Sequence, residues 1–146
     1  MSEATLHYFC QPRQPVTVPV PVSWLTVQEF VADEAACRFL WEMVTTQFRT
    51  RGKFLAVWPG VRYVALHRGP GGQVDALLLV TTAINWQIDY VVVHPEARRQ
   101  GLAAALVKET LNRALAAGVP YVMLSSRAGL RPLYEGECGF RVVSES

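Results

Sequence analysis

The sequence has few cysteines and no long hydrophobic run, and each shortage excludes a class of protein. Three cysteines are an odd number, and Cys10, Cys37 and Cys138 lie far apart with no CxxC spacing. This pattern argues against a disulfide framework and against a zinc site. The longest apolar candidate, residues 76–80, is far shorter than the roughly 20 residues that a membrane-spanning helix needs. We therefore expect a reduced, cytoplasmic protein with no metal and no membrane segment.

The chain also lacks an excess of either charge. Fourteen basic and twelve acidic side chains give a net charge of +2, and neither half of the chain collects one sign. A nucleic-acid-binding or membrane-surface protein typically concentrates basic residues, so we predict neither partner. The N-terminus shows no basic region followed by an apolar segment, and we expect no secretory signal.

Apolar residues are plentiful. They make up 51% of the chain while charged residues make up 18%, which excludes intrinsic disorder. A chain of 146 residues suits one domain, and a folded chain of this size buries roughly 68–70% of the surface that its unfolded form exposes. We predict a single domain over residues 1–146 with its own hydrophobic core.

The first third of the chain divides into an extended part and a helical part. Residues 11–22 contain four prolines, which fix φ and lack a donor, so we predict that residues 1–22 form an extended strap. Residues 23–50 carry helix signals. Thr26 and Glu29 have capping-box spacing, and Asp33 can cap a second helix that reaches about residue 50. Apolar residues recur along that helix at helical spacing: Ala36, Phe39, Leu40, Val44 and Phe48.

Strand signals dominate the middle of the chain. Residues 54–58 and 61–67 flank Pro59-Gly60, a glycine cluster follows at 69–72, and residues 74–83 complete an antiparallel hairpin. Residues 88–93 are a further strand. A helix follows Gly101 and ends near Gly118. After it we predict a strand at 121–124, a short helix or turn at 130–136, and a last strand at 140–143. This order predicts an α+β domain around a mixed sheet.

The segment from residue 91 to residue 104 joins a strand to a helix through a sharp turn. The first turn of a helix leaves about four backbone N–H groups without partners, and the helix dipole adds positive potential there. Gly101 has no Cβ, and the side chains of Ala103 and Ala104 are small, so a phosphate can approach the backbone. A diphosphate is the predicted ligand. The alternative is a plain strand–helix connection, because short glycine motifs recur by chance.

Two motifs in this part of the chain resemble those of the GNAT superfamily of N-acetyltransferases. Arg98-Arg99-Gln100-Gly101-Leu102-Ala103 fits the signature R/Q-x-x-G-x-G/A and directly follows a strand that ends V-x-P. Downstream, Leu133-Tyr134-Glu135 and Gly139-Phe140 resemble the second signature, LYE..GF. The resemblance covers roughly residues 54–143, and residues 23–50 agree with it in type only.

The resemblance implies a mixed, mostly antiparallel twisted sheet flanked by helices and splayed between its fourth and fifth strands. Residues 54–143 would be the sheet and CoA-binding core, and residues 23–50 the acceptor side. It implies acetyl-CoA as cosubstrate and a primary amine of a small molecule or peptide as acceptor. An N–H group near Val91 would face the thioester oxygen. The implied CoA-binding residues are Val91, Val92, Val93, Arg98, Arg99, Gln100, Gly101, Leu102, Ala103, Ala104 and Ser126.

Two residues are candidates for the chemistry. Tyr134 matches the family tyrosine that protonates the leaving thiolate, and a phenol with a pKa near 10 keeps its proton at neutral pH. The alternative is that Tyr134 is a core residue. Gln87 occupies the position of the family's glutamate base and cannot take a proton. Asp89 is two residues further on, and strand alternation places Gln87, Asp89, Val91 and Val93 on one face. Asp89 is therefore a candidate base, with a structural role or a water base as alternatives.

Two departures from the family pattern carry their own predictions. Tyr134 and Gly139 are five residues apart where four is usual, which predicts a bulged or broken helix end near Gly136. The usual final strand is missing after residues 140–143. We predict that either residues 6–9 or a second copy in a homodimer completes the sheet, since an unpaired edge favours aggregation. Gln87 and the shifted Tyr134 also keep an alternative function open, a weak or inactive CoA-binding module that serves as a sensor or assembly subunit.

Overall fold

The computed structural model describes residues 3–48, 51–82 and 85–146. Seven strands form one sheet in the order β2-β3-β4-β5-β6-β1-β7, and every neighbouring pair is antiparallel except β5–β6. The strands are β1 (Thr5–Cys10), β2 (Ser23–Thr26), β3 (Val61–Arg68), β4 (Val74–Thr82), β5 (Trp86–Val93), β6 (Val122–Arg127) and β7 (Arg141–Glu145).

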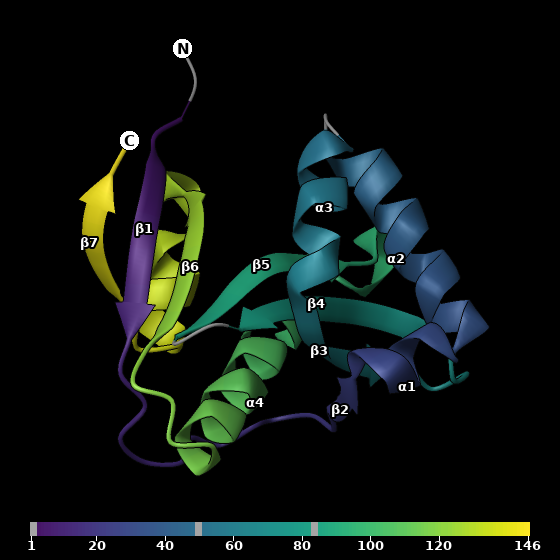
Figure 1. Ribbon diagram of the computed structural model, residues 1–146, viewed down its shortest axis with the longest axis horizontal. Helices are drawn as coiled ribbons and strands as arrows, with labels where there is room; N and C mark the ends of the chain where they lie inside the picture. The colour runs from purple at the N-terminus through teal and green to yellow at the C-terminus, as the bar shows by residue number, and fades with distance from the viewer. Residues whose placement is uncertain (1–2, 49–50, 83–84) are drawn as a thin grey trace.

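Helices cover both faces of this sheet (Figure 1). One face carries α4, and the other carries the three helices that precede β3. Within the described ranges, no helix is long and apolar enough to cross a membrane. The α-helices are α1 (Val27–Val31), α2 (Glu34–Gln47), α3 (Gly52–Val57) and α4 (Leu102–Ala116), and a π-helix spans Pro132–Glu137. The mixed α+β fold predicted from the sequence is confirmed.

The central strand β4 is buried on both sides. Leu78 and Val80 pack into the core under α4, whereas Leu77 and Leu79 pack into the core under α1, α2 and α3. A strand covered on both faces needs a continuous apolar run rather than an alternating one. The sequence from Ala76 to Val80 meets that need. The strand was predicted to reach residue 83, which lies outside the described residues.

The predicted helix starts in the first third of the chain are confirmed. The backbone N–H of Glu29 donates to Thr26 Oγ1 (3.2 Å), and the N–H of Thr26 donates to Glu29 Oε1 (2.8 Å), which completes the capping box. The Asp33 carboxylate accepts a hydrogen bond from the N–H of Ala36 (3.0 Å) at the start of α2. The described part of α2 ends at Gln47, and the predicted end at residue 50 falls outside the described residues.

Two local predictions are wrong. Residues 54–58 form the last four residues of α3 and the start of a 3-10 turn (Trp58–Gly60), not a strand. Phe54 is buried and Trp58 is half-buried, whereas Leu55 is 60% exposed, so the buried positions recur at helical spacing. A run of five apolar residues is too short for the sequence alone to distinguish the 3.6-residue period of a helix from the two-residue period of a strand. Ser23–Thr26, predicted within a helical region, is the edge strand β2.

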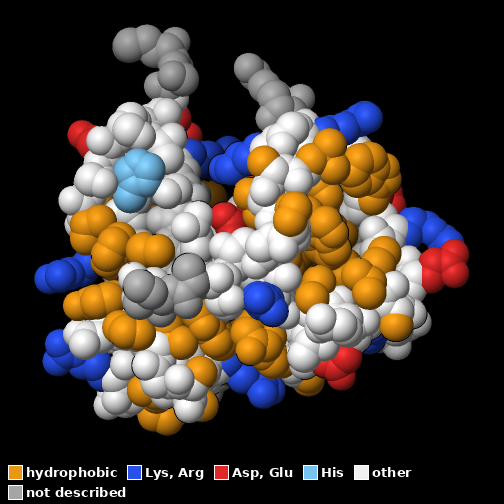
Figure 2. Space-filling view, in the orientation of Figure 1, with side chains coloured by type: hydrophobic (Ala, Val, Ile, Leu, Met, Phe, Trp, Pro, Cys, Tyr) orange, Lys and Arg blue, Asp and Glu red, His pale blue; other side chains and the backbone are white. Residues whose placement is uncertain are grey.

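The N-terminal segment completes the sheet. β1 lies between β6 and β7 and is antiparallel to both, with Leu6 opposite Ser126 and Tyr8 opposite Leu124 and Val142. This confirms the first of the two predicted ways to close the sheet; the homodimer stays a prediction. Since β6 is paired with β1 along its whole length, the sheet stays intact on one side of β6 while its other side opens beyond Leu124. The molecule is hollowed beside that opening (Figure 2).

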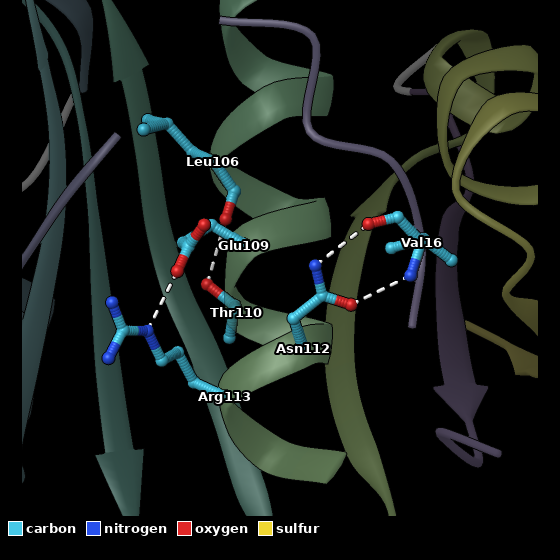
Figure 3. Close-up of polar contacts among 6 residues, drawn as sticks. All are labelled: Val16, Leu106, Glu109, Thr110, Asn112 and Arg113. Carbon is cyan, nitrogen blue, oxygen red and sulfur yellow. Dashed lines mark hydrogen bonds and ion pairs between the residues drawn. The ribbon is translucent and has the colours of Figure 1, made fainter. Parts of the chain in front are cut away.

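The proline-rich strap carries the chain from β1 to β2 without forming a helix or strand between residues 11 and 22. It passes along α4 (Figure 1) and is held there by one side chain. The Nδ2 of Asn112 donates to the carbonyl of Val16 (2.8 Å), and its Oδ1 accepts from the N–H of Val16 (2.8 Å) (Figure 3). The amide of Asn112 thus pairs with the strap as a neighbouring strand would.

Replacing Asn112 with Ala should lower the free energy of unfolding by about 1–3 kcal/mol, because two hydrogen bonds are worth roughly 0.5–1.5 kcal/mol each. Denaturant unfolding measures the change. The control is Glu109→Gln on the same helix, which removes a surface ion pair with Arg113 (2.7 Å) worth about 0.3–0.5 kcal/mol. Equal effects of the two changes would show that the strap does not depend on Asn112.

Candidate active site

The site begins where two neighbouring strands separate. β5 and β6 are parallel and pair only over Trp86–Val122, Gln87–Met123 and Ile88–Leu124. Beyond these pairs both strands continue, to Val93 and Arg127, without bonding to each other. A cleft of about 620 Å³ lies along the opening, and Figure 2 shows basic side chains at its upper end. This is the splay that the resemblance to the GNAT superfamily implied.

The cleft receives polar side chains from several elements. β5 contributes a carboxylate, β6 contributes two hydroxyls and a guanidinium, the π-helix contributes a phenol, and α2 and α3 contribute an amide and an ammonium. These residues are Asp89, Ser125, Ser126, Arg127, Tyr134, Gln47 and Lys53. Among the described lining residues, Asp89 is the only carboxylate.

A second cavity of about 380 Å³ adjoins the start of α4. It shares Val91, Arg98, Arg127 and Tyr134 with the cleft, so the two form one continuous channel. Most of the predicted CoA-binding residues line it, namely Val91, Val93, Arg98, Arg99, Gly101, Leu102, Ala103 and Ala104. Two do not. The Val92 side chain is buried under α2, and Gln100 borders a different cavity beside His94.

The turn before α4 is shaped for an anion. Gly101 has a φ of +73°, and no side chain caps the helix, whose first backbone bond runs from the N–H of Ala105 to the carbonyl of Gly101 (3.0 Å). A Cβ built on Gly101 would meet nothing within 4 Å. The N–H groups of the first turn are therefore available at an open surface, and a helix N-terminus of this kind favours a phosphate.

A β-bulge redirects the side chains of β5. Its register with β4 passes from Leu79–Tyr90 to Val80–Ile88 and leaves Asp89 opposite no residue. Ile88 consequently faces α4, whereas Tyr90 faces α2. The prediction that Gln87, Asp89, Val91 and Val93 share a face is therefore wrong: Val91 and Val93 pack on the α4 side. An extra residue in a strand breaks the alternation of period two, and nothing in this sequence marks it.

Asp89 is held on the α2 side of the sheet. Its Oδ1 accepts a hydrogen bond from Nε2 of Gln87 (2.8 Å), and its Oδ2 accepts one from the hydroxyl of Thr81 (2.6 Å). Thr81 and Gln87 are opposite each other in the β4–β5 ladder, so both donors come from one cross-strand pair. The carboxylate is thereby fixed in orientation at the wall of the cleft.

Tyr134 reaches the cleft from the α4 side. Its ring packs against those of Tyr8 (5.5 Å between centroids) and Phe140 (6.4 Å), and only 5% of its surface is exposed. Burial raises the pKa of Tyr134 to about 12, while the nearby Ser126 hydroxyl acts in the opposite direction. The phenol therefore stays protonated at neutral pH by a wide margin.

The extra residue between Tyr134 and Gly139 is accommodated as predicted. The N–H of Cys138 donates to the carbonyl of Leu133 (3.1 Å), a bond five residues long that makes this turn a π-helix. The wider turn keeps Tyr134 pointing into the core under α4.

The polar groups of the cleft come from opposite faces of the sheet. Leu124 packs under α4, so its neighbour Ser125 faces the other side, as Asp89 does. Ser126 lies on the α4 side together with Tyr134. A molecule that lies in the opening thus meets the phenol on one side and the carboxylate with the Ser125 hydroxyl on the other.

Sequence reasoning missed several residues of the cleft. Lys53 was not identified because the residues that follow it were predicted to form a strand and not a helix. Its Nζ lies 6.0 Å from the centre of the Tyr90 ring, and it lines the cleft. Gln47 gave no signal, although its Nε2 donates to the carbonyl of Val93 (3.2 Å). The strand predicted at 121–124 extends to Arg127, so Ser125, which the sequence did not single out, lies within β6 beside the predicted Ser126.

Residues 36–140 match the model of the Acetyltransferase (GNAT) family, which is more than half of the chain. The chain belongs to the GNAT family of acetyltransferases. No curated protein matches the chain, but its fold is shared with solved GNAT structures. A GCN5-related N-acetyltransferase from Sphaerobacter thermophilus is 23% identical with a TM-score of 0.72, over 98% of this chain and 49% of that protein.

Two other solved structures extend this comparison. A ribosomal-protein-alanine N-acetyltransferase from Brucella melitensis biovar Abortus is 15% identical with a TM-score of 0.62, over 86% of this chain and 94% of that one. A NatC complex bound to Gag peptide and CoA is 16% identical with a TM-score of 0.56, over 79% of this chain and 82% of that one. The chain spans 49%, 61% and 55% of the lengths of three similar structures, so it corresponds to about half of each.

Difference titration of wild type against Tyr134→Phe, followed by phenolate absorption in the near ultraviolet, should assign to Tyr134 a pKa near 12. The raised pKa also means that burial of the neutral phenol favours the folded state below pH 10. This contribution, about 2–3 kcal/mol at 1.36 kcal/mol per pKa unit, is lost as the pH rises from 10 to 12. A titration of Tyr134 near pH 10 would show that the phenol is exposed.

Proposed function

We propose that this GNAT protein transfers an acetyl group from acetyl-CoA to the primary amine of a small molecule or a peptide. The observation that carries the proposal is a single channel that holds a phenol on one side of the sheet and a carboxylate on the other, and that ends at an uncapped helix N-terminus. An acetyl thioester needs these three provisions: an acid for the departing sulfur, a place for the amine, and a site for the diphosphate.

The channel suits CoA in shape and charge. The N–H groups of residues 101–104 and the guanidinium groups of Arg98 and Arg99 would hold the pyrophosphate. The opened edges of β5 and β6 would bond to the amides of the pantetheine arm as a strand would, beside Val91 and Ser126. When bound, acetyl-CoA supplies an activated acetyl group, and an N–H near Val91 would stabilise the oxyanion.

Tyr134 would give its proton to the sulfur of the leaving CoA. Its raised pKa means that Tyr134 holds its proton at neutral pH and can donate it as the C–S bond breaks. Asp89 would attract the ammonium group of the acceptor from the opposite side, and it is a candidate to take the ammonium proton. A fixed carboxylate facing a largely cationic cleft directs a positively charged amine to one place.

A second function remains as an alternative, because Gln87 stands where the family places a glutamate. Gln87 donates a hydrogen bond to Asp89 and cannot accept a proton, so a weak or inactive CoA-binding module is the alternative proposal. Turnover distinguishes the two, since a module would bind CoA without releasing thiol in the presence of amines. We further propose that the protein works in the cytoplasm, in keeping with its three free cysteines.

Tyr134→Phe should lower kcat by roughly 10²–10⁴-fold, the usual contribution of a general acid, and leave CoA binding intact. The assay is release of free CoA thiol from acetyl-CoA against a panel of amino acids, peptides, aminosugars and polyamines. Tyr8→Phe is the matched control. It removes a buried hydroxyl that has no hydrogen-bond partner among the described residues, and it should leave kcat unchanged. Full activity of Tyr134→Phe would refute the assigned role.

Gly101→Glu should abolish the thermal stabilisation that CoA gives, because the new carboxylate would occupy the phosphate position and repel it. Gly118→Glu at the other end of α4 is the control. Gly118 has nearly the same φ (+72° against +73°) and equally open space, so both changes bring similar strain and the same charge. Equal CoA-induced shifts in the two variants would rule out the helix N-terminus as the phosphate site.

A further inference from the structure

A histidine on β1 is hydrogen-bonded to the wall of the cleft. His7 stands opposite Ser125 in the β1–β6 ladder, and its Nδ1 lies 2.7 Å from the hydroxyl of Ser125. Its Nε2 lies 3.1 Å from the hydroxyl of Ser146, beyond the end of β7. Ser125 lines the cleft, and His7 lies behind it. The three side chains therefore form a chain of hydrogen bonds that leads from the cleft across β1.

This arrangement has the chemical parts of a proton relay. A hydroxyl, a ring nitrogen within hydrogen-bond reach and a third group that orients the ring are together able to remove a proton from a neighbouring molecule. In a neutral imidazole one nitrogen accepts and the other donates. When Ser125 donates to Nδ1, the Nε2–H donates to Ser146, and the oxygen of Ser125 is free to accept a proton from the cleft.

The position of Ser125 matters as much as its partner. Ser125 and Asp89 reach the cleft from the same face of the sheet, opposite the face that carries Tyr134. Both oxygens of Asp89 already accept hydrogen bonds, from Thr81 and Gln87. These two bonds fix the carboxylate of Asp89, which can hold an ammonium group by its charge. Ser125 lines the same cleft and is hydrogen-bonded to an imidazole.

We propose that His7 takes the proton of the acceptor ammonium through Ser125, while Asp89 holds that ammonium in place; this inference rests on the proposed acetyl transfer. One ammonium proton passes to the Ser125 oxygen as the Ser125 proton passes to Nδ1 of His7. The freed amine forms the C–N bond, and the C–S bond breaks. Tyr134 gives its proton to the sulfur and regains the second proton that leaves the nitrogen.

Charged side chains from the neighbouring strands lie on both faces of the sheet around His7. Arg127 from β6 and Arg141 from β7 face the same side of the sheet as His7, opposite Thr5 and Phe9 respectively. Glu145 stands opposite Leu6 and therefore faces the other side. His7 itself is a positioning and proton-storing residue, since Ser125 is the group that would touch the acceptor.

The experiment compares the pH dependence of kcat/KM for wild type, His7→Asn and Ser125→Ala. Asparagine can keep a hydrogen bond to Ser125 but cannot store a proton. Wild type should lose activity at acid pH, because an imidazolium has no free nitrogen to accept the proton of Ser125. Both variants should lack this acid limb of the pH profile, that is, the fall in kcat/KM at acid pH. Their kcat/KM at neutral pH should be at least about 10²-fold lower than that of wild type. With methoxyamine, which is already neutral at pH 7, the defect of both variants should largely disappear.

The control is His67→Asn, which removes an imidazole bonded to the carbonyl of Pro21 (2.8 Å) and not part of the cleft; its profile should match wild type. Thermal unfolding and the CoA-induced shift check the fold of each variant. If His7→Asn does not fold, Ser125→Ala carries the test alone, since it leaves His7 in place.

Four outcomes would overturn the relay. The acid limb could persist in both variants, or it could disappear in Asp89→Asn instead. The defect could be equally large with methoxyamine, which would assign His7 a structural role. Mass spectrometry of a quenched reaction could find an acetyl group on Ser125, which would make it a nucleophile. Wild type that releases no CoA with any amine would overturn the proposed function itself, an outcome distinct from these four.

Discussion

The separation of β5 from β6 after Ile88 is the constraint on which the rest of the structure depends. Two parallel strands that stop pairing leave backbone N–H and C=O groups facing an open space, and such groups require hydrogen-bonding partners. Water can satisfy them, but an extended ligand with its own amides satisfies them in register. The opening therefore creates both the cleft and the preference for a long, amide-bearing ligand.

Other elements keep this opening from collapsing. β1 pairs with the whole length of β6 on its far side, so β6 cannot swing across to close the gap without breaking that ladder. The aromatic rings of Tyr8, Tyr134 and Phe140 pack together beneath it. The bulge at Asp89 turns a carboxylate toward one side of the opening while the π-helix brings a phenol to the other. Two local irregularities of the backbone, the bulge and the π-helix, thus position the carboxylate and the phenol at the cleft.

The sequence alone predicted the parts of the fold that rest on local signals. The caps at Thr26 and Asp33, the buried strand β4 and the turn before α4 each have a local cause, and the structure confirms them. The bulge at Asp89 could not be predicted, because it depends on the register with β4. Nor could the pairing of His7 with Ser125, since 118 residues separate them and only the sheet brings them together.

The most direct test of the central claim is a titration of the isotopically labelled protein with acetyl-CoA, followed by backbone amide chemical shifts. The account predicts that the amides of residues 91, 93, 101–104 and 125–126 move together and saturate at one concentration, because all of these residues line one channel. Shifts confined to another surface, or none at saturating acetyl-CoA, would contradict the claim that the opened strands form the binding site.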